Sequence, residues 1–239
     1  MKLIQGIGIK KTFGGIKALS DVDFEVEEGT IVGLIGPNGA GKTTLFNIVA
    51  GAFAPTSGTV RFEGREITGW PAYKVCRSGI ARTFQVTRPF GEMSCLENVA
   101  VSVVNRQSGI SRSQWTTLAA ECLETVGLSD FRATEARHLN VIQKKRLEIA
   151  RALATRPRLL MLDEVLGGLN SQEVQESIDF IRGLRDEKGL TVLWIEHVMG
   201  AIMQATEKVI VLDQGSVLTT GTPESVVNDP RVIQAYLGD

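Results

Sequence analysis

The stretch that decides the fold of this chain reads Gly36-Pro37-Asn38-Gly39-Ala40-Gly41-Lys42-Thr43-Thr44. It fits the pattern G-x-x-x-x-G-K-[ST], in which glycines let backbone N–H groups approach phosphate oxygens closely. The apolar run 30–35 before it predicts a buried strand, and Leu45, Ile48 and Val49 after it have helical spacing. A glycine-rich turn that binds nothing is the alternative interpretation, but the flanking strand and helix favour a phosphate-binding loop.

The end of this loop carries the side chains that phosphate chemistry needs. A helix that begins near Lys42 would place its positive dipole end under the phosphate oxygens. We expect the Lys42 ammonium to reach the β- and γ-phosphates of a nucleotide, and the Thr43 hydroxyl to bind Mg²⁺.

A second apolar run, Leu159–Leu162, ends in the carboxylates Asp163 and Glu164. A continuous apolar run of this length is typical of a parallel strand that is buried on both faces. Alone, it would be interpreted as a buried strand that ends in two solvated acids. Together with the phosphate loop, it predicts a catalytic site in which Asp163 holds Mg²⁺ and Glu164 polarises an attacking water.

The composition limits the classes of protein to which this chain can belong. Its 239 residues are 43% hydrophobic, which suits one large globular domain or one domain with a subdomain. The net charge is −1, so the chain lacks the surplus of basic residues that is typical of nucleic-acid-binding proteins. No apolar run reaches the ~20 residues that span a bilayer, and the first residues lack a signal peptide's apolar stretch, so we expect a cytosolic chain.

Cysteine and histidine do not indicate a metal site. Cys76, Cys95 and Cys122 are scattered without C-x-x-C spacing, so ordinary reduced thiols are expected. The two histidines are too few for a zinc cluster.

Periodicity predicts a sheet early in the chain and helices in its middle. Residues 2–10 and 20–27 alternate apolar and polar side chains, as the strands of a hairpin-like sheet do. Residues 58–68 are predicted to form a short hairpin that turns at Glu63 and Gly64.

The region of about 87–140 is predicted to be mostly helical, whereas the pattern from residue 143 onward alternates helix and strand. Helices are expected near 95–104 and 113–126, separated by Ser108 and Gly109. The predicted architecture is a nucleotide-binding α/β core that is interrupted by a helical part.

With these motifs the chain resembles, over essentially its whole length, the ATP-binding cassette (ABC) ATPases that power membrane transporters. The resemblance implies an α/β P-loop NTPase core of ABC type with an antiparallel β subdomain and a helical subdomain. It implies one nucleotide-binding domain over residues 1–239, with the helical subdomain at about 87–155. It also implies ATP and Mg²⁺ as ligands, with Gly36–Thr44 around the phosphates and Glu164 as the base or water polariser.

The resemblance assigns roles to three residues whose local sequence decides little. Phe13 matches the aromatic residue that stacks on adenine, with a core aromatic at a strand end as the alternative. Gln85 matches the glutamine that contacts Mg²⁺ and the attacking water, with an ordinary surface residue as the alternative. His197 matches the histidine that hydrogen-bonds the γ-phosphate, with a structural histidine as the alternative. The segment Gly167–Asn170 matches the loop that crosses the dimer interface.

One segment departs from the family's pattern. The signature Leu-Ser-Gly-Gly-Gln or Leu-Ser-Tyr-Gly-Gln corresponds here to Leu139-Asn140-Val141-Ile142-Gln143. Ile142 replaces the glycine whose amide lies near the γ-phosphate bound by the opposite subunit, and its β-branch restricts φ. Asn140 can still cap the helix and donate a hydrogen bond, so Asn140 and Gln143 stay candidates for contact with that nucleotide. Val165 stands where the family often has proline.

Within the family the chain is most similar to ATPase subunits of branched-chain amino-acid importers. The similarity rests on the segments 81–85, 147–153, 168–170, 195–199 and 229–238. It implies attachment to the cytoplasmic face of the cell membrane, as a peripheral subunit. The implied partners are a second ABC ATPase subunit, identical or different, transmembrane permease subunits and, indirectly, a solute-binding protein, with no nucleic acid.

Two alternatives stay open at this point. The first is a soluble ABC ATPase that acts on nucleic acid or ribosomes. Relatives of that kind tend to carry two cassettes or a long coiled-coil insert, whereas this chain has one cassette and no heptad run. The second is a regulatory ATP-binding subunit with weak turnover. The altered signature is compatible with this alternative, whereas the presence of Glu164 and His197 argues against it.

Overall fold

The computed structural model describes residues 1–106, 109 and 111–237 of the chain. It divides into two compact units, one formed by Met1–Val75 with Leu166–Asp239 and the other by Cys76–Val165. The predicted separator Ser108 lies outside the described residues.

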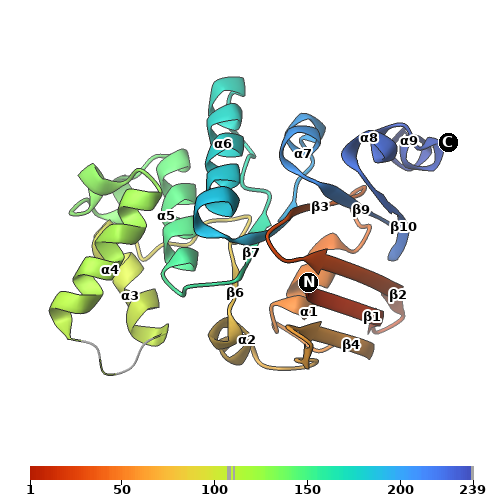
Figure 1. The fold of residues 1–239 in the computed structure, drawn as a ribbon, viewed down its shortest axis with the longest axis horizontal. Coiled ribbons are helices and arrows are strands. Elements are labelled where there is room, and N and C mark those ends of the chain that lie inside the picture. The colour runs from red at the N-terminus through yellow and green to blue at the C-terminus, as the bar shows by residue number, and fades with distance from the viewer. Residues whose placement is uncertain (107–108, 110, 238–239) are drawn as a thin grey trace. The chain divides into compact units, whose positions relative to one another are not determined.

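The first unit contains an antiparallel sheet in the strand order β2-β1-β4-β5 (Figure 1). Its strands are β1 (Lys2–Phe13), β2 (Ile16–Glu27), β4 (Ser57–Phe62) and β5 (Arg65–Glu66). Glu63 and Gly64 join β4 to β5, both with positive φ, as a two-residue hairpin turn requires. The predicted strands and the predicted turn are therefore confirmed, although β1 and β2 are longer than the alternating patterns indicated.

The same unit contains the strands that carry the phosphate loop. β3 (Ile31–Ile35) pairs in parallel with β8 (Thr191–Ile195) and β9 (Lys208–Asp213), and β10 (Ser216–Gly221) pairs antiparallel with β9. Every residue of β3 and β8 is buried, which explains their continuous apolar sequence.

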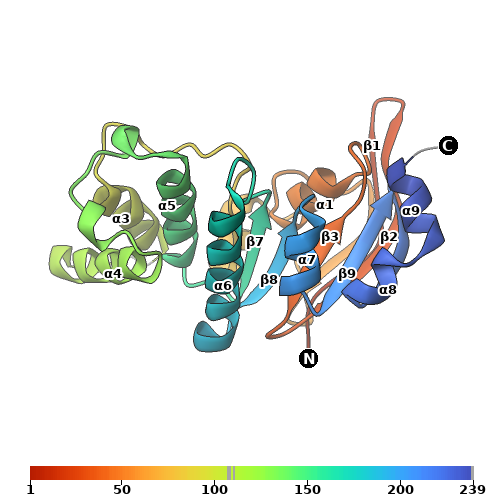
Figure 2. The ribbon, with the colours of Figure 1, turned by 90° about the horizontal axis from the view of Figure 1, so that it is seen from above.

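Helices pack against these strands (Figure 2). The helices of the unit are α1 (Lys42–Val49), α6 (Ser171–Lys188), α7 (Met199–Ala205), α8 (Pro223–Val227) and α9 (Pro230–Leu237). A buried apolar cluster joins β3 and β9 to α7, α8 and α9, and it consists of Ile35, Ile202, Val209, Val211, Val226 and Val232.

The second unit has two short parallel strands and several helices. β6 (Ile80–Arg82) follows α2 (Ala72–Ser78) and pairs with β7 (Leu159–Asp163). The helices between these strands are α3 (Cys95–Arg106), α4 (Arg112–Thr125) and α5 (Val141–Leu153), with the 3₁₀ turns Ser129–Phe131 and Ala136–His138 between α4 and α5. The two helices predicted near 95–104 and 113–126 are confirmed. None of the helices in the described part of the chain has the length and apolar character needed to cross a membrane.

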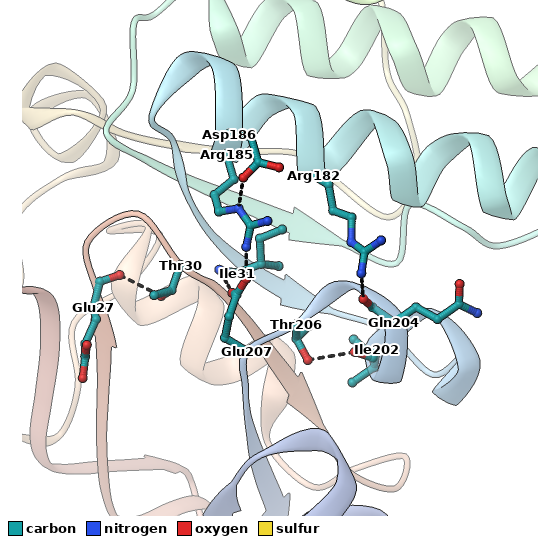
Figure 3. A network of polar contacts seen from close by, with 10 residues as sticks. All are labelled: Glu27, Thr30, Ile31, Arg182, Arg185, Asp186, Ile202, Gln204, Thr206 and Glu207. Atoms are coloured by element: carbon teal, nitrogen blue, oxygen red, sulfur yellow. Dashed lines mark hydrogen bonds and ion pairs between the residues drawn. The ribbon is translucent and has the colours of Figure 1, made fainter.

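A polar network fixes the beginning of β3, at the end opposite the phosphate loop (Figure 3). The Glu207 carboxylate accepts a hydrogen bond of 2.6 Å from the backbone N–H of Ile31 and forms an ion pair with Arg185 of α6. Arg185 also contacts Asp186 at 2.6 Å. The contact to Ile31 matters most, because Ile31 is fully buried and a buried amide needs an acceptor.

We predict that Glu207→Ala lowers the free energy of unfolding by ~1–3 kcal/mol, because the Ile31 amide loses its acceptor. Denaturant unfolding followed by circular dichroism measures the change. The control is Glu187→Ala, which removes an exposed carboxylate from the same helix as Arg185 and should change stability by at most ~0.5 kcal/mol. Equal stability of both variants would contradict the role given to Glu207.

Candidate active site

The phosphate loop follows β3 in a backbone conformation that only glycine adopts easily. Gly36 and Gly41 have φ of +146° and +102°, and Gly41 is the cap residue before α1. A Cβ at Gly36 would collide with the backbone carbonyl of Leu212, and one at Gly41 would lie 2.7 Å from the carbonyl oxygen of Ala18. The glycines at these two places are therefore required by space as well as by φ.

Lys42 folds back over the loop from which it comes. Its side chain is buried, and its Nζ donates hydrogen bonds to the carbonyl oxygens of Gly36 at 2.6 Å and Pro37 at 2.9 Å. The neighbouring Thr43 is exposed. The loop therefore holds a cation at its centre and presents a hydroxyl beside it, which is the pair of groups that the sequence motif predicts.

The ring of Phe13 lies at the surface at the end of β1. It is 45% exposed and packs edge-on against Phe53, with ring centroids 5.3 Å apart. The Lys11 ammonium lies 5.0 Å from the centre of the Phe13 ring. The alternative of a buried core aromatic is thus wrong, and the ring is accessible for stacking.

His197 follows β8 and is also accessible. Its side chain is 60% exposed, and its Nδ1 lies 3.9 Å from the carboxylate of Glu196. Glu196 is buried and accepts hydrogen bonds from the backbone N–H groups of Leu166 at 2.8 Å and His197 at 3.3 Å. Glu196, to which the sequence motifs assigned no role, fixes the backbone that presents His197.

In the second unit, Asp163 ends β7 as a buried carboxylate with a counter-ion. Its Oδ2 lies 2.7 Å from Nη2 of Arg82, which ends the neighbouring strand β6. The backbone N–H of Asp163 donates to the Thr83 hydroxyl at 3.2 Å. Both side chains of the pair are at most one-tenth exposed, so the charge of Arg82 compensates a carboxylate that water does not reach well.

The two catalytic candidates of this unit touch each other. The Gln85 amide donates a hydrogen bond from Nε2 to Oε2 of Glu164, with 2.5 Å between the two atoms. Glu164 has φ +49°, a left-handed conformation that is costly for a residue with a Cβ. The backbone turn after Asp163 and the Gln85 amide together set the direction of the Glu164 carboxylate.

The unusual signature segment forms the start of α5. Asn140 caps the helix through Oδ1, which accepts from the Gln143 N–H at 2.8 Å, and Gln143 Oε1 accepts from the Asn140 N–H at 3.0 Å. Ile142 lies in the first turn of α5, in helical backbone, where a β-branched side chain is tolerated. The restriction of φ expected from isoleucine therefore causes no strain here.

Comparisons with known proteins agree with this arrangement. A family profile described as ABC transporter matches residues 19–167, and one described as branched-chain amino acid ATP-binding cassette transporter matches residues 216–239. The chain is 42% identical to the high-affinity branched-chain amino acid transport ATP-binding protein BraF of Pseudomonas aeruginosa, over 99% of this chain and 98% of BraF. It is 40% identical to the LivG protein of the same description from Escherichia coli K12, over 97% and 96%.

Solved structures show the same fold. A cassette of an ABC transporter in its ADP conformation superposes with a TM-score of 0.89 at 30% identity, covering both chains completely. A dimeric bacterial ABC transporter cassette superposes with a TM-score of 0.83 at 27% identity, covering 92% of this chain and 98% of that one.

The fold and the loop define a P-loop ATPase of the ATP-binding cassette type. The chain belongs to the ABC transporter family, and it is an ATPase that binds ATP. The predicted α/β fold class and the predicted similarity to importer ATPase subunits are confirmed. The roles of the individual site residues stay predictions.

We predict that Arg82→Met lowers the free energy of unfolding by ~3–5 kcal/mol, because it leaves the buried Asp163 carboxylate without its counter-ion. Arg82→Lys keeps the charge and should lose less. The double variant Arg82→Met/Asp163→Asn should lose clearly less than the sum of its two single changes, since the pair acts as a unit. Strict additivity in denaturant unfolding would contradict the pairing.

Proposed function

We propose that this chain is the ATPase subunit of a membrane importer for branched-chain amino acids or a similar small solute. The ATPase activity in this proposal is supported mainly by the complete phosphate loop, in which the buried Lys42 ammonium donates a hydrogen bond to the carbonyl of Gly36. The import part is supported by the identity of about 40% to BraF and LivG over almost the whole chain.

In this proposal the loop binds the phosphates of ATP. Backbone N–H groups of Asn38–Thr44, at the tip of the loop and the start of α1, face the phosphate oxygens, and Lys42 exchanges its carbonyl partners for the β- and γ-phosphates. Phe13 stacks on adenine, because its ring is accessible and braced by Phe53. Charge that develops on the phosphates during transfer is then stabilised by groups already in place.

The residues proposed for Mg²⁺ fit that ion chemically. Thr43, Asp163 and Gln85 offer a hydroxyl, a carboxylate and an amide oxygen, all hard oxygen donors of the kind that Mg²⁺ prefers. When bound there, Mg²⁺ would supply positive charge that stabilises the negative charge of the phosphates. The ion pair with Arg82 holds the Asp163 carboxylate in one orientation for this purpose.

Glu164 is the proposed base or water polariser. The amide of Gln85 holds its carboxylate, and the accessible His197 is the group proposed to hydrogen-bond the γ-phosphate. Because the Glu164 carboxylate acts on water rather than on phosphate, binding and hydrolysis should depend on different residues.

The proposed partners follow from family membership and from the dimeric cassette with the same fold. The chain forms a dimer with a second ABC ATPase subunit, through Gly167–Asn170 and the signature segment. It attaches peripherally to the cytoplasmic face of the cell membrane, where permease subunits contact the region 86–126. A solute-binding protein delivers the solute to those permease subunits.

We predict that Lys42→Ala abolishes tight ATP binding and turnover in the assembled transporter, whereas Glu164→Gln keeps binding and stops hydrolysis. Equilibrium binding of ATP and release of inorganic phosphate measure the two effects separately. Lys188→Ala and Glu187→Gln are the controls, since both side chains are exposed at the end of α6. Rapid hydrolysis by Glu164→Gln would remove Glu164 from the catalytic role.

A second prediction concerns the signature segment. The segment lacks the serine of the family's signature and has Ile142 in place of the glycine whose amide lies near the partner's nucleotide, so we expect one donor toward that nucleotide to be lost, while Asn140 Nδ2 is left as a donor. The site built from the partner's phosphate loop and this signature should therefore be the slower one. The loss of one transition-state donor, about 10²–10³ in rate, sets the scale of the difference.

The test is the double change Asn140→Ser/Ile142→Gly in an assembled complex. In this complex, Glu164→Gln silences the site that contains this chain's own phosphate loop, so that only the site with the partner's phosphate loop turns over. It should raise turnover at the partner's phosphate loop, and the control Val141→Ala, an exposed position of the same segment, should not. If turnover stays unchanged in a folded complex that closes on ATP, the natural segment is fully competent and the two sites need not differ.

A further inference from the structure

The first residue of the phosphate loop is held by a side chain from 200 positions further along the chain. The backbone N–H of Gly36 donates a hydrogen bond to the hydroxyl of Tyr236, with 2.8 Å between nitrogen and oxygen. Gly36 is buried, and its backbone lies directly against the carbonyl of Leu212. A buried N–H needs a partner, and the Tyr236 hydroxyl supplies it.

Tyr236 reaches the loop because α9 is anchored one turn earlier. Val232 is 3% exposed and belongs to the buried cluster that also contains Ile35, the residue directly before Gly36. Val232 and Tyr236 are four positions apart and so share one face of the helix. Val232 therefore belongs to the same buried cluster as Ile35, and the Tyr236 hydroxyl contacts the next residue of the chain, Gly36.

Gly36 is held from two sides. Its N–H contacts Tyr236, and its carbonyl accepts from the Lys42 ammonium at 2.6 Å. Any displacement of Gly36 would move the carbonyl that orients Lys42. The position of the hydroxyl on α9 is thus linked, through a single residue, to the cation at the centre of the loop.

The Tyr236 hydroxyl suits this role chemically. Tyr236 is 40% exposed, and the burial of the rest of its side chain raises its pKa above the ordinary value, although the hydrogen bond from Gly36 opposes the shift. The group therefore stays neutral at physiological pH and accepts the N–H through an oxygen lone pair. Phenylalanine would keep the ring and remove only this acceptor, so the contribution of the hydroxyl can be isolated.

We propose that Tyr236 is a positioning residue for nucleotide binding: its hydroxyl fixes Gly36 and keeps the phosphate loop in the conformation that accepts phosphate. The proposal rests on the nucleotide-binding role proposed for the loop. It gives a physical task to the segment 216–239, which a family profile separate from that of the cassette core matches. Without the hydroxyl, the loop would spend less time in the binding-competent state, and the apparent dissociation constant would rise by the same factor.

The test compares Tyr236→Phe with Tyr73→Phe, which removes the hydroxyl of the other, well exposed tyrosine. For the full-length chain we expect Tyr236→Phe to weaken binding of a fluorescent ADP analogue about tenfold, or ~1.4 kcal/mol. In the assembled transporter the KM for ATP should rise while kcat stays within about twofold. Amide hydrogen exchange of peptides covering 31–45 should become faster. A general loss of folding stability would also accelerate exchange outside these peptides, so the two effects can be told apart. Tyr73→Phe should leave all three quantities unchanged.

The outcomes separate this inference from the proposed function. Binding within about twofold of the natural chain, with unchanged exchange in 31–45, would overturn the role of Tyr236. If Tyr236→Phe has no effect while Lys42→Ala in the same assay loses ADP binding, only the role given to Tyr236 is wrong. If Lys42→Ala binds normally, the nucleotide-binding role of the loop itself is wrong. Ile233→Ala, an exposed change on the same helix, guards against a general effect of mutating α9.

Discussion

The structure of the first unit depends on the burial of a cation inside a loop of backbone. The Lys42 ammonium is buried and donates hydrogen bonds to the carbonyl oxygens of Gly36 and Pro37. Burying a charge is costly unless hydrogen bonds replace its water. The backbone must therefore curve tightly around Lys42, and this curvature explains glycine at 36 and 41, the buried strand before the loop and the helix after it.

The second unit also contains a buried charge that needs a partner, in this case the negative charge of a carboxylate. Asp163 is buried at the end of β7, and Arg82 at the end of β6 compensates it. One residue later, Glu164 adopts a left-handed backbone that directs its carboxylate toward the amide of Gln85. Strain of this kind persists only where surrounding contacts enforce it and is often found at functional sites. In the proposed mechanism, Asp163 serves the metal ion and Glu164 serves the attacking water.

Local patterns in the sequence predicted the parts of the site that are local in the fold. The strand, loop and helix around Gly36–Thr44 follow from apolar periodicity and glycine spacing, and they were predicted correctly. Contacts between segments that are distant in the sequence were not predicted, because local sequence patterns contain no information about them. Arg82 pairs with Asp163 from 81 positions away, and Tyr236 reaches Gly36 from 200. The exposure of Phe13 likewise depends on packing that the sequence alone left open.

The central claim is that Gly36–Thr44 receives the phosphates of the nucleotide. Titration of the ¹⁵N-labelled chain with Mg²⁺ and ADP, followed by amide chemical shifts, tests it most directly. Backbone amides that donate to phosphate should show the largest shifts of the whole chain, and these should lie within 36–44, at Gly39, Gly41 and Lys42 above all. Saturable ADP binding that leaves the amides of 36–44 unshifted would contradict the account.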